Sequence, residues 1–313
     1  MSNWITRGLG LLLLVFGLGV AAIRAPDRPV QSLLQRWAPA PSDFIDINGL
    51  MVHVRDEGPR SDQQPIVLIH GMSSSLHTWE GWTDALRGKR RIISFDLPGF
   101  GLTGPNANGD YHDTTYVKFV LNVLDELKLK RVILVGNSLG GQIAWQLAAQ
   151  APARVSHLVL VNAAGYAFES ESVPLAFQMA KNPVGQWLSR ELLPRMLIAN
   201  SVRDVYGDPS KVNGEVVDRY FELALREGNR QALIQRIEQL EPGKYIDQLA
   251  LISQPTLIIW GGQDRLIPVV NANNFKRDIP GSQLVIFDKR GHVPQEEAPE
   301  QTVIALKAFL NIR

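Results

Sequence analysis

The sequence contains no cysteine among its 313 residues. Disulfide bonds, catalytic thiolates and cysteine-ligated metals are therefore excluded, and the redox state of the compartment is left open because no thiol responds to it. The 6 histidines are scattered without the spacing of a metal-binding motif, so we expect neither a metal nor another cofactor. The formal net charge of +1 gives no indication of nucleic acid or of an acidic partner.

Long apolar runs are rare in this chain, apart from one near the N-terminus. Residues 8–23, GLGLLLLVFGLGVAAI, carry no charge and are followed by several arginines. The run is slightly long for the apolar part of a signal peptide and slightly short for a membrane-spanning helix. Because positive charge beyond the run opposes simple export, we interpret residues 1–25 as an uncleaved membrane anchor or signal segment. Export with cleavage after Ala22 is the alternative.

The next segment is rich in proline. Residues 26–42 are expected to form a linker that tethers the rest of the chain to the N-terminal segment. A short helical pattern at residues 30–37 is expected to lie either along a membrane surface or along the following domain. The sequence does not determine which side of a membrane that domain would face.

Beyond the linker, short apolar runs alternate with helical patterns. Alternating apolar and polar residues around Asn48-Gly49 predict a β-hairpin. Buried strands are expected at residues 65–69, 91–95, 131–135, 155–161, 256–260 and 284–287. Helices are expected at residues 78–86, 114–127, 141–149 and 302–310. This alternation predicts an α/β fold with a mostly parallel sheet and helices on both faces.

The alternation breaks in the middle of the chain. Residues 166–250 hold no convincing strand, are helical in pattern and are interrupted by prolines. They lie between two core segments, residues 43–165 and 251–313, and leave the carboxyl edge of the sheet, so we expect a helical cap over a site there. Candidates for an apolar pocket in this cap are Phe177, Met179, Trp187, Leu192, Leu193 and Met196.

The most informative motif is Gly136-Asn137-Ser138-Leu139-Gly140, which joins a predicted strand to a predicted helix. A strand, a G-x-S-x-G turn and a helix form a nucleophile elbow. The turn holds the serine in a strained conformation, and the flanking glycines remove side chains that would collide. Ser138 is therefore the predicted nucleophile, at a helix N-terminus that favours developing negative charge.

A serine nucleophile needs a base, and the base needs an orienting acid. Asp264 follows the strand at 256–260, and His292 follows the last strand. Both therefore lie at the same sheet edge as Ser138, in the order Ser, Asp, His that accompanies a nucleophile elbow. We predict that His292 moves the serine proton and that Asp264 fixes the imidazole tautomer.

The oxyanion of such a reaction needs preorganised donors. One predicted donor is the backbone N–H of Leu139, directly after the nucleophile. The other is the backbone N–H of Met72, in the loop after the strand at 65–69. Ser73 and the two serines after it are expected to line the site, whereas His70 is expected to shape the loop through hydrogen bonds to the backbone.

The motifs His70-Gly71, residues 96–101 (DLPGFG), Ser138 with its glycines, Gly262-Gln263-Asp264 and Gly291-His292 occur in this order. In this respect residues 43–313 resemble the α/β-hydrolase superfamily. The resemblance implies a capped, single-chain serine hydrolase. Haloalkane dehalogenases and epoxide hydrolases also resemble this pattern, but they carry aspartate at the elbow.

Two kinds of relative remain open. The elbow and the turn at residues 162–165 are similar to the hydrolases of aromatic meta-cleavage products, which break a carbon–carbon bond. Arg219 would then hold a substrate carboxylate, as their cap arginine does. Those enzymes usually place tryptophan after the catalytic histidine, whereas Val293-Pro294 follows here, which is more like esterases and lipases of the monoacylglycerol type.

The leading hypothesis is a membrane-associated hydrolase of an apolar, lipid-like carboxylic ester, acting through an acyl-enzyme on Ser138. The carbon–carbon bond hydrolase is the second hypothesis. A catalytically inactive ligand-binding protein of the same fold is the third, disfavoured because the serine, aspartate and histidine are all present. The expected partners are a small ester substrate and a membrane, with no nucleic acid and no obligate protein partner.

Overall fold

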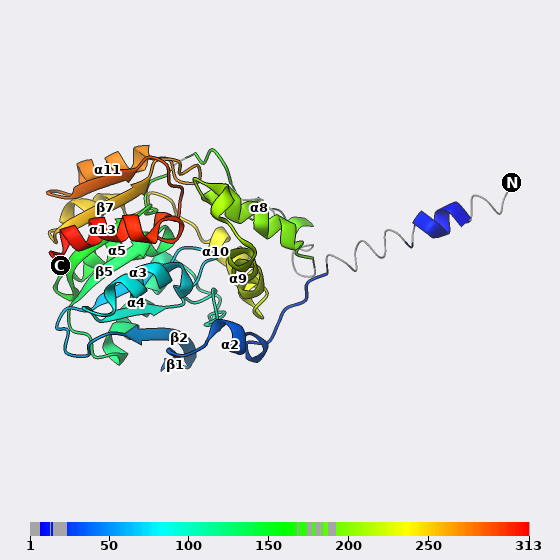
Figure 1. The fold of residues 1–313 in the computed structure, drawn as a ribbon, viewed down its shortest axis with the longest axis horizontal. Helices are drawn as coiled ribbons and strands as arrows, with labels where there is room; N and C mark the ends of the chain where they lie inside the picture. Colours follow the sequence, from blue (N-terminus) through cyan, green and yellow to red (C-terminus); the bar gives the residue numbers. More distant parts are fainter. Residues whose placement is uncertain are drawn as a thin grey trace.

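The structure is a computed structural model, and it describes residues 7–12, 14, 24–167, 169–173, 177–178, 182, 184–186 and 192–312. Its centre is an 8-stranded sheet with the order β1-β2-β4-β3-β5-β6-β7-β8. The strands are β1 (Ser42–Ile47), β2 (Leu50–Glu57), β3 (Ile66–Ile69), β4 (Ile92–Phe95), β5 (Val132–Asn137), β6 (Val155–Val161), β7 (Thr256–Gly261) and β8 (Gln283–Phe287). The pairs β1–β2 and β2–β4 are antiparallel and the others are parallel, which confirms the predicted mostly parallel sheet (Figure 1).

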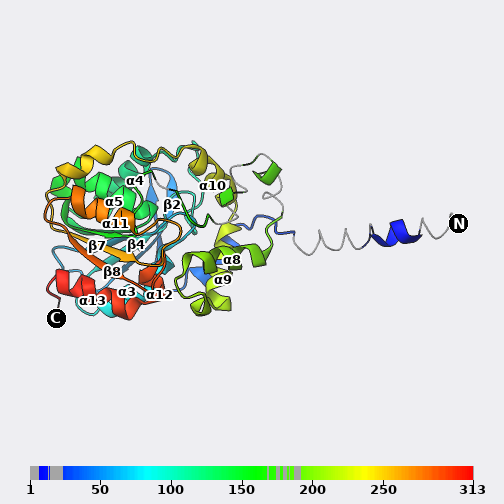
Figure 2. The ribbon, with the colours of Figure 1, turned by 90° about the horizontal axis from the view of Figure 1, so that it is seen from above.

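Helices cover both faces of this sheet. They are α3 (Glu80–Leu86), α4 (Asp113–Glu126), α5 (Leu139–Gln150), α11 (Val270–Asp278), α12 (Pro294–Glu297) and α13 (Pro299–Phe309). Figure 2 shows α4, α5 and α11 on one face and α3, α12 and α13 on the other. Because successive strand residues point to opposite faces, Val67 of β3 is buried in the first core and Leu68 in the second.

The predicted hairpin is confirmed, with Asn48 and Gly49 at φ of 56° and 87°, the left-handed conformation that a tight hairpin turn requires. Two predicted helices differ in detail from the structure. The helix expected at 78–86 instead begins as a 3₁₀ turn, η1 (Leu76–Trp79), before α3. The last helix begins earlier than expected, because Pro299 is well suited to a first helical turn.

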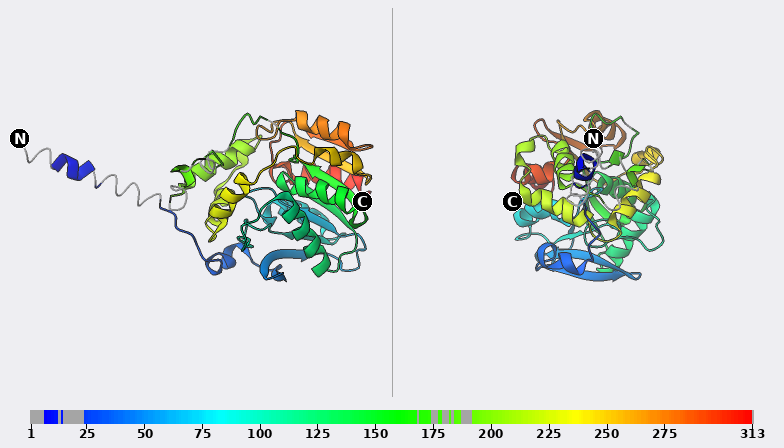
Figure 3. Two further views of the ribbon diagram at one scale, coloured as in Figure 1. Left: turned by 180° about the vertical axis from the view of Figure 1, so that it is seen from behind. Right: turned by 90° about the vertical axis from the view of Figure 1, so that its right-hand side faces the viewer.

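Between β6 and β7 the described residues form helices and no strand of the sheet. The helices are α8 (Arg195–Val205), η3 (Pro209–Lys211), α9 (Gly214–Ala224), α10 (Asn229–Glu238) and η4 (Ile246–Leu251). The left view of Figure 3 shows α8, α9 and α10 at the end of the domain away from the C-terminus. We call the segment 166–250 the cap, as in the sequence analysis.

The segment before β1, which we call the strap (residues 24–41), is not a free tether. Its helix α2 (Gln31–Trp37) buries Leu33 and Trp37 in a small core with Leu223 of α9. Asp27 of the strap forms an ion pair with Arg230 of α10, at 2.5 Å. Apolar burial and ion pairs therefore dock the segment onto the cap, and of the two expected placements of α2 the structure has the one along the domain.

Only residues 8–12 and 14 of the N-terminal apolar run are described. The side chains of Leu9, Leu11, Leu12 and Leu14 are all exposed. Among the residues that the structure describes, no helix is long and apolar enough to cross a membrane. The rest of the predicted anchor or signal segment lies outside the described residues, so the anchor stays a prediction.

Candidate active site

The predicted nucleophile lies at a sharp turn between β5 and α5. Ser138 has φ of 55° and ψ of −117°, a conformation that costs a residue with a side chain backbone strain. A Cβ atom on Gly136 would lie 2.1 Å from the carbonyl oxygen of Gly140, and one on Gly140 would lie 2.2 Å from that of Ile69. Only glycine fits at these two positions, as the elbow motif requires.

Asp264 and His292 meet beside this turn. The Nδ1 atom of His292 lies 2.7 Å from Oδ2 of Asp264, and both side chains are buried. The backbone N–H groups of Leu266 and Ile267 donate to Oδ1 of Asp264, each at 2.9 Å. These bonds fix the carboxylate, so the proton on Nδ1 leaves Nε2 of His292 to accept a proton.

Asn162, in the turn directly after β6, supports this pair. Its side-chain amide donates to Oδ2 of Asp264 at 2.6 Å, and its Oδ1 accepts from the N–H of Gly261 at 3.2 Å. Asn137 similarly donates to the backbone carbonyl of His292 at 3.1 Å. Amides at the carboxyl ends of neighbouring strands were the signal that could have identified both residues.

The structure places Ser138 and His292 in the wall of one cavity. No hydrogen bond joins their side chains within the described part of the chain. In a substrate-free site such bonds are often long and shorten in the substrate complex. A Cβ on Gly71 would lie 3.0 Å from the Cβ of Ser138, so the loop after β3 closely approaches the nucleophile.

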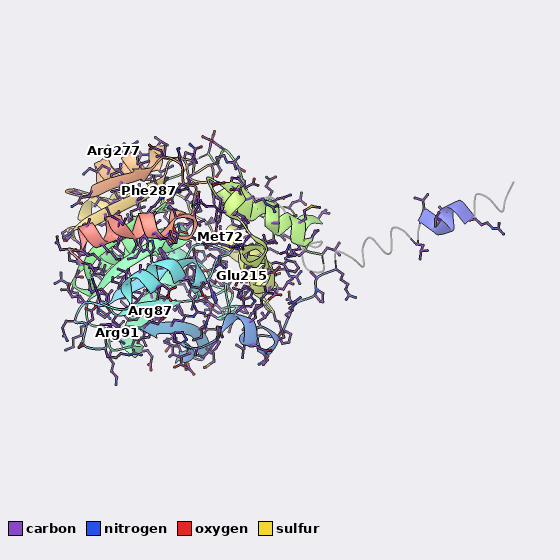
Figure 4. All side chains as sticks on the ribbon, viewed as in Figure 1. Met72, Arg87, Arg91, Glu215, Arg277 and Phe287 are labelled. Carbon is purple, nitrogen blue, oxygen red and sulfur yellow. The ribbon has the colours of Figure 1, made fainter. Side chains whose placement is uncertain are left out.

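The two predicted oxyanion donors lie on either side of this approach. Met72 directly follows Gly71, and Leu139 directly follows Ser138. Neither backbone N–H has an acceptor among the described residues. Figure 4 labels Met72 between the sheet and the cap helices, where it lines the cavity. Both N–H groups are therefore available to a substrate oxygen.

The loop that carries Met72 is held in shape by His70. The Nδ1 atom of His70 lies 2.7 Å from the carbonyl oxygen of Gly71, while its Nε2 accepts from the N–H of Leu97 at 2.9 Å. Burial lowers the pKa of this ring, so it is neutral with the proton on Nδ1. The predicted structural role of His70 is confirmed.

The cavity has a volume of about 370 Å³, within the range typical of small-molecule sites. Three predicted pocket residues, Phe177, Leu192 and Leu193, line it. Met196 does not line the cavity, and its side chain is 73% exposed. The reason is that α8 turns Ile198, and Val202 one helical turn later, toward the cavity, whereas Met196 lies on another face of the helix. Met179 and Trp187 lie outside the described residues.

The serines after Met72 are placed differently from one another. Ser73 and Ser74 line the cavity, as expected. The Oγ of Ser73 is buried without a hydrogen-bond partner in the described residues, and the φ of Ser73 is 59°. Ser75 does not line the cavity, because its hydroxyl lies 3.0 Å from Nδ1 of His77 and holds that buried ring.

Arg219 is not placed as the resemblance to carbon–carbon hydrolases implied. It does not line the cavity among the described residues, and its Nη2 lies 2.5 Å from Oε1 of Glu296. Burial by itself would lower the pKa of Arg219, but the charge of Glu296 raises that pKa above its ordinary value. The guanidinium of Arg219 therefore forms a buried ion pair with Glu296 and does not face the cavity.

Glu296 joins the cap to the segment that carries His292. Its carboxylate accepts hydrogen bonds from the hydroxyls of Tyr206 at 2.6 Å and Tyr220 at 3.2 Å, besides the ion pair with Arg219. Burial and the nearby Glu296 charge raise the pKa of both tyrosines, so they remain donors at neutral pH. No sequence pattern predicts this group of contacts, because Glu296 lies far from its partners in the chain.

Replacing Glu296 by glutamine is expected to lower the free energy of unfolding by about 2–3 kcal/mol, because the buried Arg219 loses its counter-charge. The measurement is a urea titration. A second substitution, Arg219→Met, should recover part of the loss, since it removes the uncompensated charge. Equal and additive losses from the two substitutions would contradict this assignment.

Comparisons with known proteins identify the family of the chain. The family model described as alpha/beta hydrolase fold matches residues 64–299. The chain is 30% identical over 259 residues to an uncharacterized hydrolase, YugF, of Bacillus subtilis (strain 168), covering 81% of this chain and 91% of that protein. It is 29% identical to a 2-hydroxy-6-oxo-2,4-heptadienoate hydrolase of Pseudomonas putida, covering 84% and 93%. The chain therefore belongs to the α/β hydrolase fold family.

Solved structures show the same fold. A membrane phospholipase A, described as a bacterial virulence factor, superposes with a TM-score of 0.74 at 24% identity, covering 99% of this chain and 98% of that one. A meta-cleavage product hydrolase from Pseudomonas fluorescens IP01 gives a TM-score of 0.75 at 24% identity, covering 86% and 97%. At these identities the likeness concerns the fold alone.

Proposed function

We propose that this protein is a serine-dependent carboxylic-ester hydrolase with an apolar acyl ester as substrate. The observation that carries the proposal is that Ser138 and His292, whose ring is hydrogen-bonded to Asp264, line the same mostly apolar cavity. An apolar wall favours an acyl chain through the burial of hydrophobic surface. The hydrolase family to which the chain belongs supports the reaction class.

In this mechanism Nε2 of His292 accepts the Ser138 proton as Oγ attacks the ester carbonyl. The N–H groups of Met72 and Leu139 bind the oxyanion of the tetrahedral intermediate. His292 then protonates the leaving alcohol, which leaves an acyl group on Ser138. A water molecule deprotonated by His292 attacks this acyl-enzyme, and the acid is released as Ser138 regains its proton.

Carbon–carbon bond hydrolysis is the second candidate, favoured by the similarity to a 2-hydroxy-6-oxo-2,4-heptadienoate hydrolase. Such a substrate carries a carboxylate, which calls for a cation. Arg219 is paired with Glu296, and the arginines that line the cavity, Arg230 and Arg236, form ion pairs with aspartates. These pairs favour a neutral ester.

We also propose that the N-terminal segment holds the domain at a membrane, which would supply a lipid-like ester. The apolar run at residues 8–23 supports this. The strap, which follows the run in the sequence, places its Asp27 against Arg230, a residue of the cavity wall. The similar fold of a membrane phospholipase A agrees with this arrangement. Export after signal cleavage is the alternative.

The experiment is turnover of p-nitrophenyl esters from acetate to palmitate by the full chain, beside a dienoic keto acid. We expect a maximum at one acyl length, set by the cavity, and no turnover of the keto acid. Cleavage of the keto acid alone, with Ser138 still labelled by a fluorophosphonate, would establish the carbon–carbon reaction. If the chain showed no turnover of either substrate and no labelling of Ser138, the result would contradict the proposed function and favour the ligand-binding protein.

A further inference from the structure

A buried polar cluster lies in the wall of the mostly apolar cavity. Asp113 of α4 is 4% exposed, and it accepts hydrogen bonds from Gln142 of α5 at 2.7 Å and from Arg236 of α10 at 2.7 Å. Gln142 and Arg236 line the cavity beside apolar residues such as Leu233 and Ile237. Side chains from three helices therefore form a polar group in the cavity wall. A substrate with only an apolar acyl chain would have no hydrogen-bonding group to use it.

This cluster lies close to the nucleophile. The N–H of Gln142 donates to the carbonyl oxygen of Ser138 at 3.0 Å, so Gln142 lies in the first turn of α5, directly after the nucleophile elbow. Both side chains line the same cavity. A group bound by Gln142 would therefore belong to a substrate portion near the reacting carbonyl.

Two polar atoms of the cluster at the cavity have unused hydrogen-bonding capacity. Gln146 also donates to Asp113, at 3.2 Å, and its Oε1 is buried without a partner, but Gln146 does not line the cavity. The Nε2 atom of Gln142 donates to Asp113, which leaves Oε1 turned elsewhere and without a donor in the described residues. Both terminal nitrogens of Arg236 are occupied, by Asp113 and by the carbonyl of Tyr111, whereas its Nε has no acceptor there. Buried polar atoms are usually paired, so the buried Nε of Arg236 without a partner at the cavity indicates a missing polar ligand, for which Oε1 of Gln142 is an available acceptor.

The charge of the cluster selects the kind of ligand. Arg236 and Asp113 form a buried ion pair, so their charges compensate. A carboxylate would find no net positive charge, whereas a hydroxyl can donate to Oε1 of Gln142 and accept from Nε of Arg236. A site with such unmet partners discriminates against an analogue that lacks the hydroxyl.

We infer that Gln142 and Arg236 form a subsite for a hydroxyl group of the substrate, located near the scissile carbonyl. The inference rests on the proposed ester hydrolysis, because it concerns the same cavity. The hydroxyl comes either from a hydroxylated acyl chain or from an alcohol portion with a second hydroxyl. Both sources present the same chemistry to the subsite.

The test uses Ser138→Ala protein, so that binding is measured without turnover. Dissociation constants are compared within two matched pairs of esters: a 3-hydroxyacyl ester against the plain acyl ester, and a glycol monoester against the propyl ester. We expect about tenfold tighter binding of the hydroxylated member in one pair, the value of one good buried hydrogen bond. The pair that shows the preference identifies the source of the hydroxyl.

Adding Gln142→Met, which keeps the length of the side chain but removes its amide, should reduce that ratio to about one. Gln150→Met, at an exposed position of the same helix, is the matched control and should keep the tenfold ratio. Equal binding within both pairs, before any change at Gln142, would overturn the inference. Turnover of plain esters by the unaltered chain tests the proposed function separately, so the two failures are distinguishable.

If Gln142→Met does not fold, Arg236→Lys provides the second variant. Lysine retains a cation for Asp113 but has no equivalent of the Nε donor, so the ratio should again fall toward one. A tenfold ratio that survives in a folded Gln142→Met or Arg236→Lys protein would place the hydroxyl elsewhere and refute the subsite.

Discussion

Replacing Ser138 by alanine is expected to reduce kcat for the best p-nitrophenyl ester by about 10⁵-fold, because the acyl-enzyme can no longer form. Residual turnover would come from the oxyanion donors and from binding. The substrate should still bind with a similar affinity, since the acyl chain contacts the cavity wall and not the hydroxyl. The measurement is steady-state kinetics together with fluorophosphonate labelling, which should disappear.

Two controls accompany this variant. Ser61→Ala, at an exposed position far along the chain, should leave kcat and labelling as they were. Ser138→Gly should abolish turnover equally but raise the free energy of unfolding by about 1 kcal/mol, because glycine adopts the positive φ of 55° without strain. Unchanged turnover in Ser138→Ala would remove the serine from the mechanism and with it the proposed function.

Replacing Asp96 by alanine is expected to lower the free energy of unfolding by about 3–5 kcal/mol, the usual cost of breaking a buried charged network. Asp96 is fully buried. Its carboxylate lies 2.8 Å from Nδ1 of His53 and accepts from the N–H groups of Leu76 at 2.7 Å and Leu102 at 2.8 Å. Alanine would leave all of these donors buried and unpaired.

The pH dependence of this effect has a definite sign. Burial alone would raise the pKa of Asp96, but the charge and hydrogen bond of His53 lower it below its ordinary value. The stability that the carboxylate contributes is therefore present above the unfolded-state pKa of about 3.9 and is lost as the pH falls below it. The difference between the two proteins should be constant near neutral pH and shrink in acid.

Urea titrations of the unaltered chain and of Asp96→Ala at several pH values measure this difference. Asp84→Ala is the matched control, because Asp84 is exposed and its ion pair with Arg87 should be worth less than about 1 kcal/mol. A loss in Asp96→Ala as small as that of the control would show that the network around Asp96 is unimportant for stability.

The sequence by itself determined the fold and the prediction of a serine nucleophile. A continuous apolar run such as that of β3 is typical of a strand buried on both faces, and parallel strands bring their carboxyl ends to one edge. Ser138, Asp264 and His292 each follow such a strand, so their proximity follows from local pattern and chain order. The glycines of the elbow are local requirements too, because backbone sterics act over a few residues.

The tertiary structure decided which polar groups pair with one another. Asn162 supports Asp264, Glu296 binds Arg219, and Asp27 of the strap binds Arg230. Each pair joins segments far apart in the chain, and no periodicity encodes the partner of a single charged side chain. The resemblance to carbon–carbon hydrolases implied that Arg219 binds a substrate carboxylate. In the structure Arg219 instead binds the carboxylate of Glu296, a partner that no sequence pattern predicts. The sequence therefore determined the reaction class, through short-range sterics and strand order, whereas the shape and polarity of the cavity depend on long-range packing.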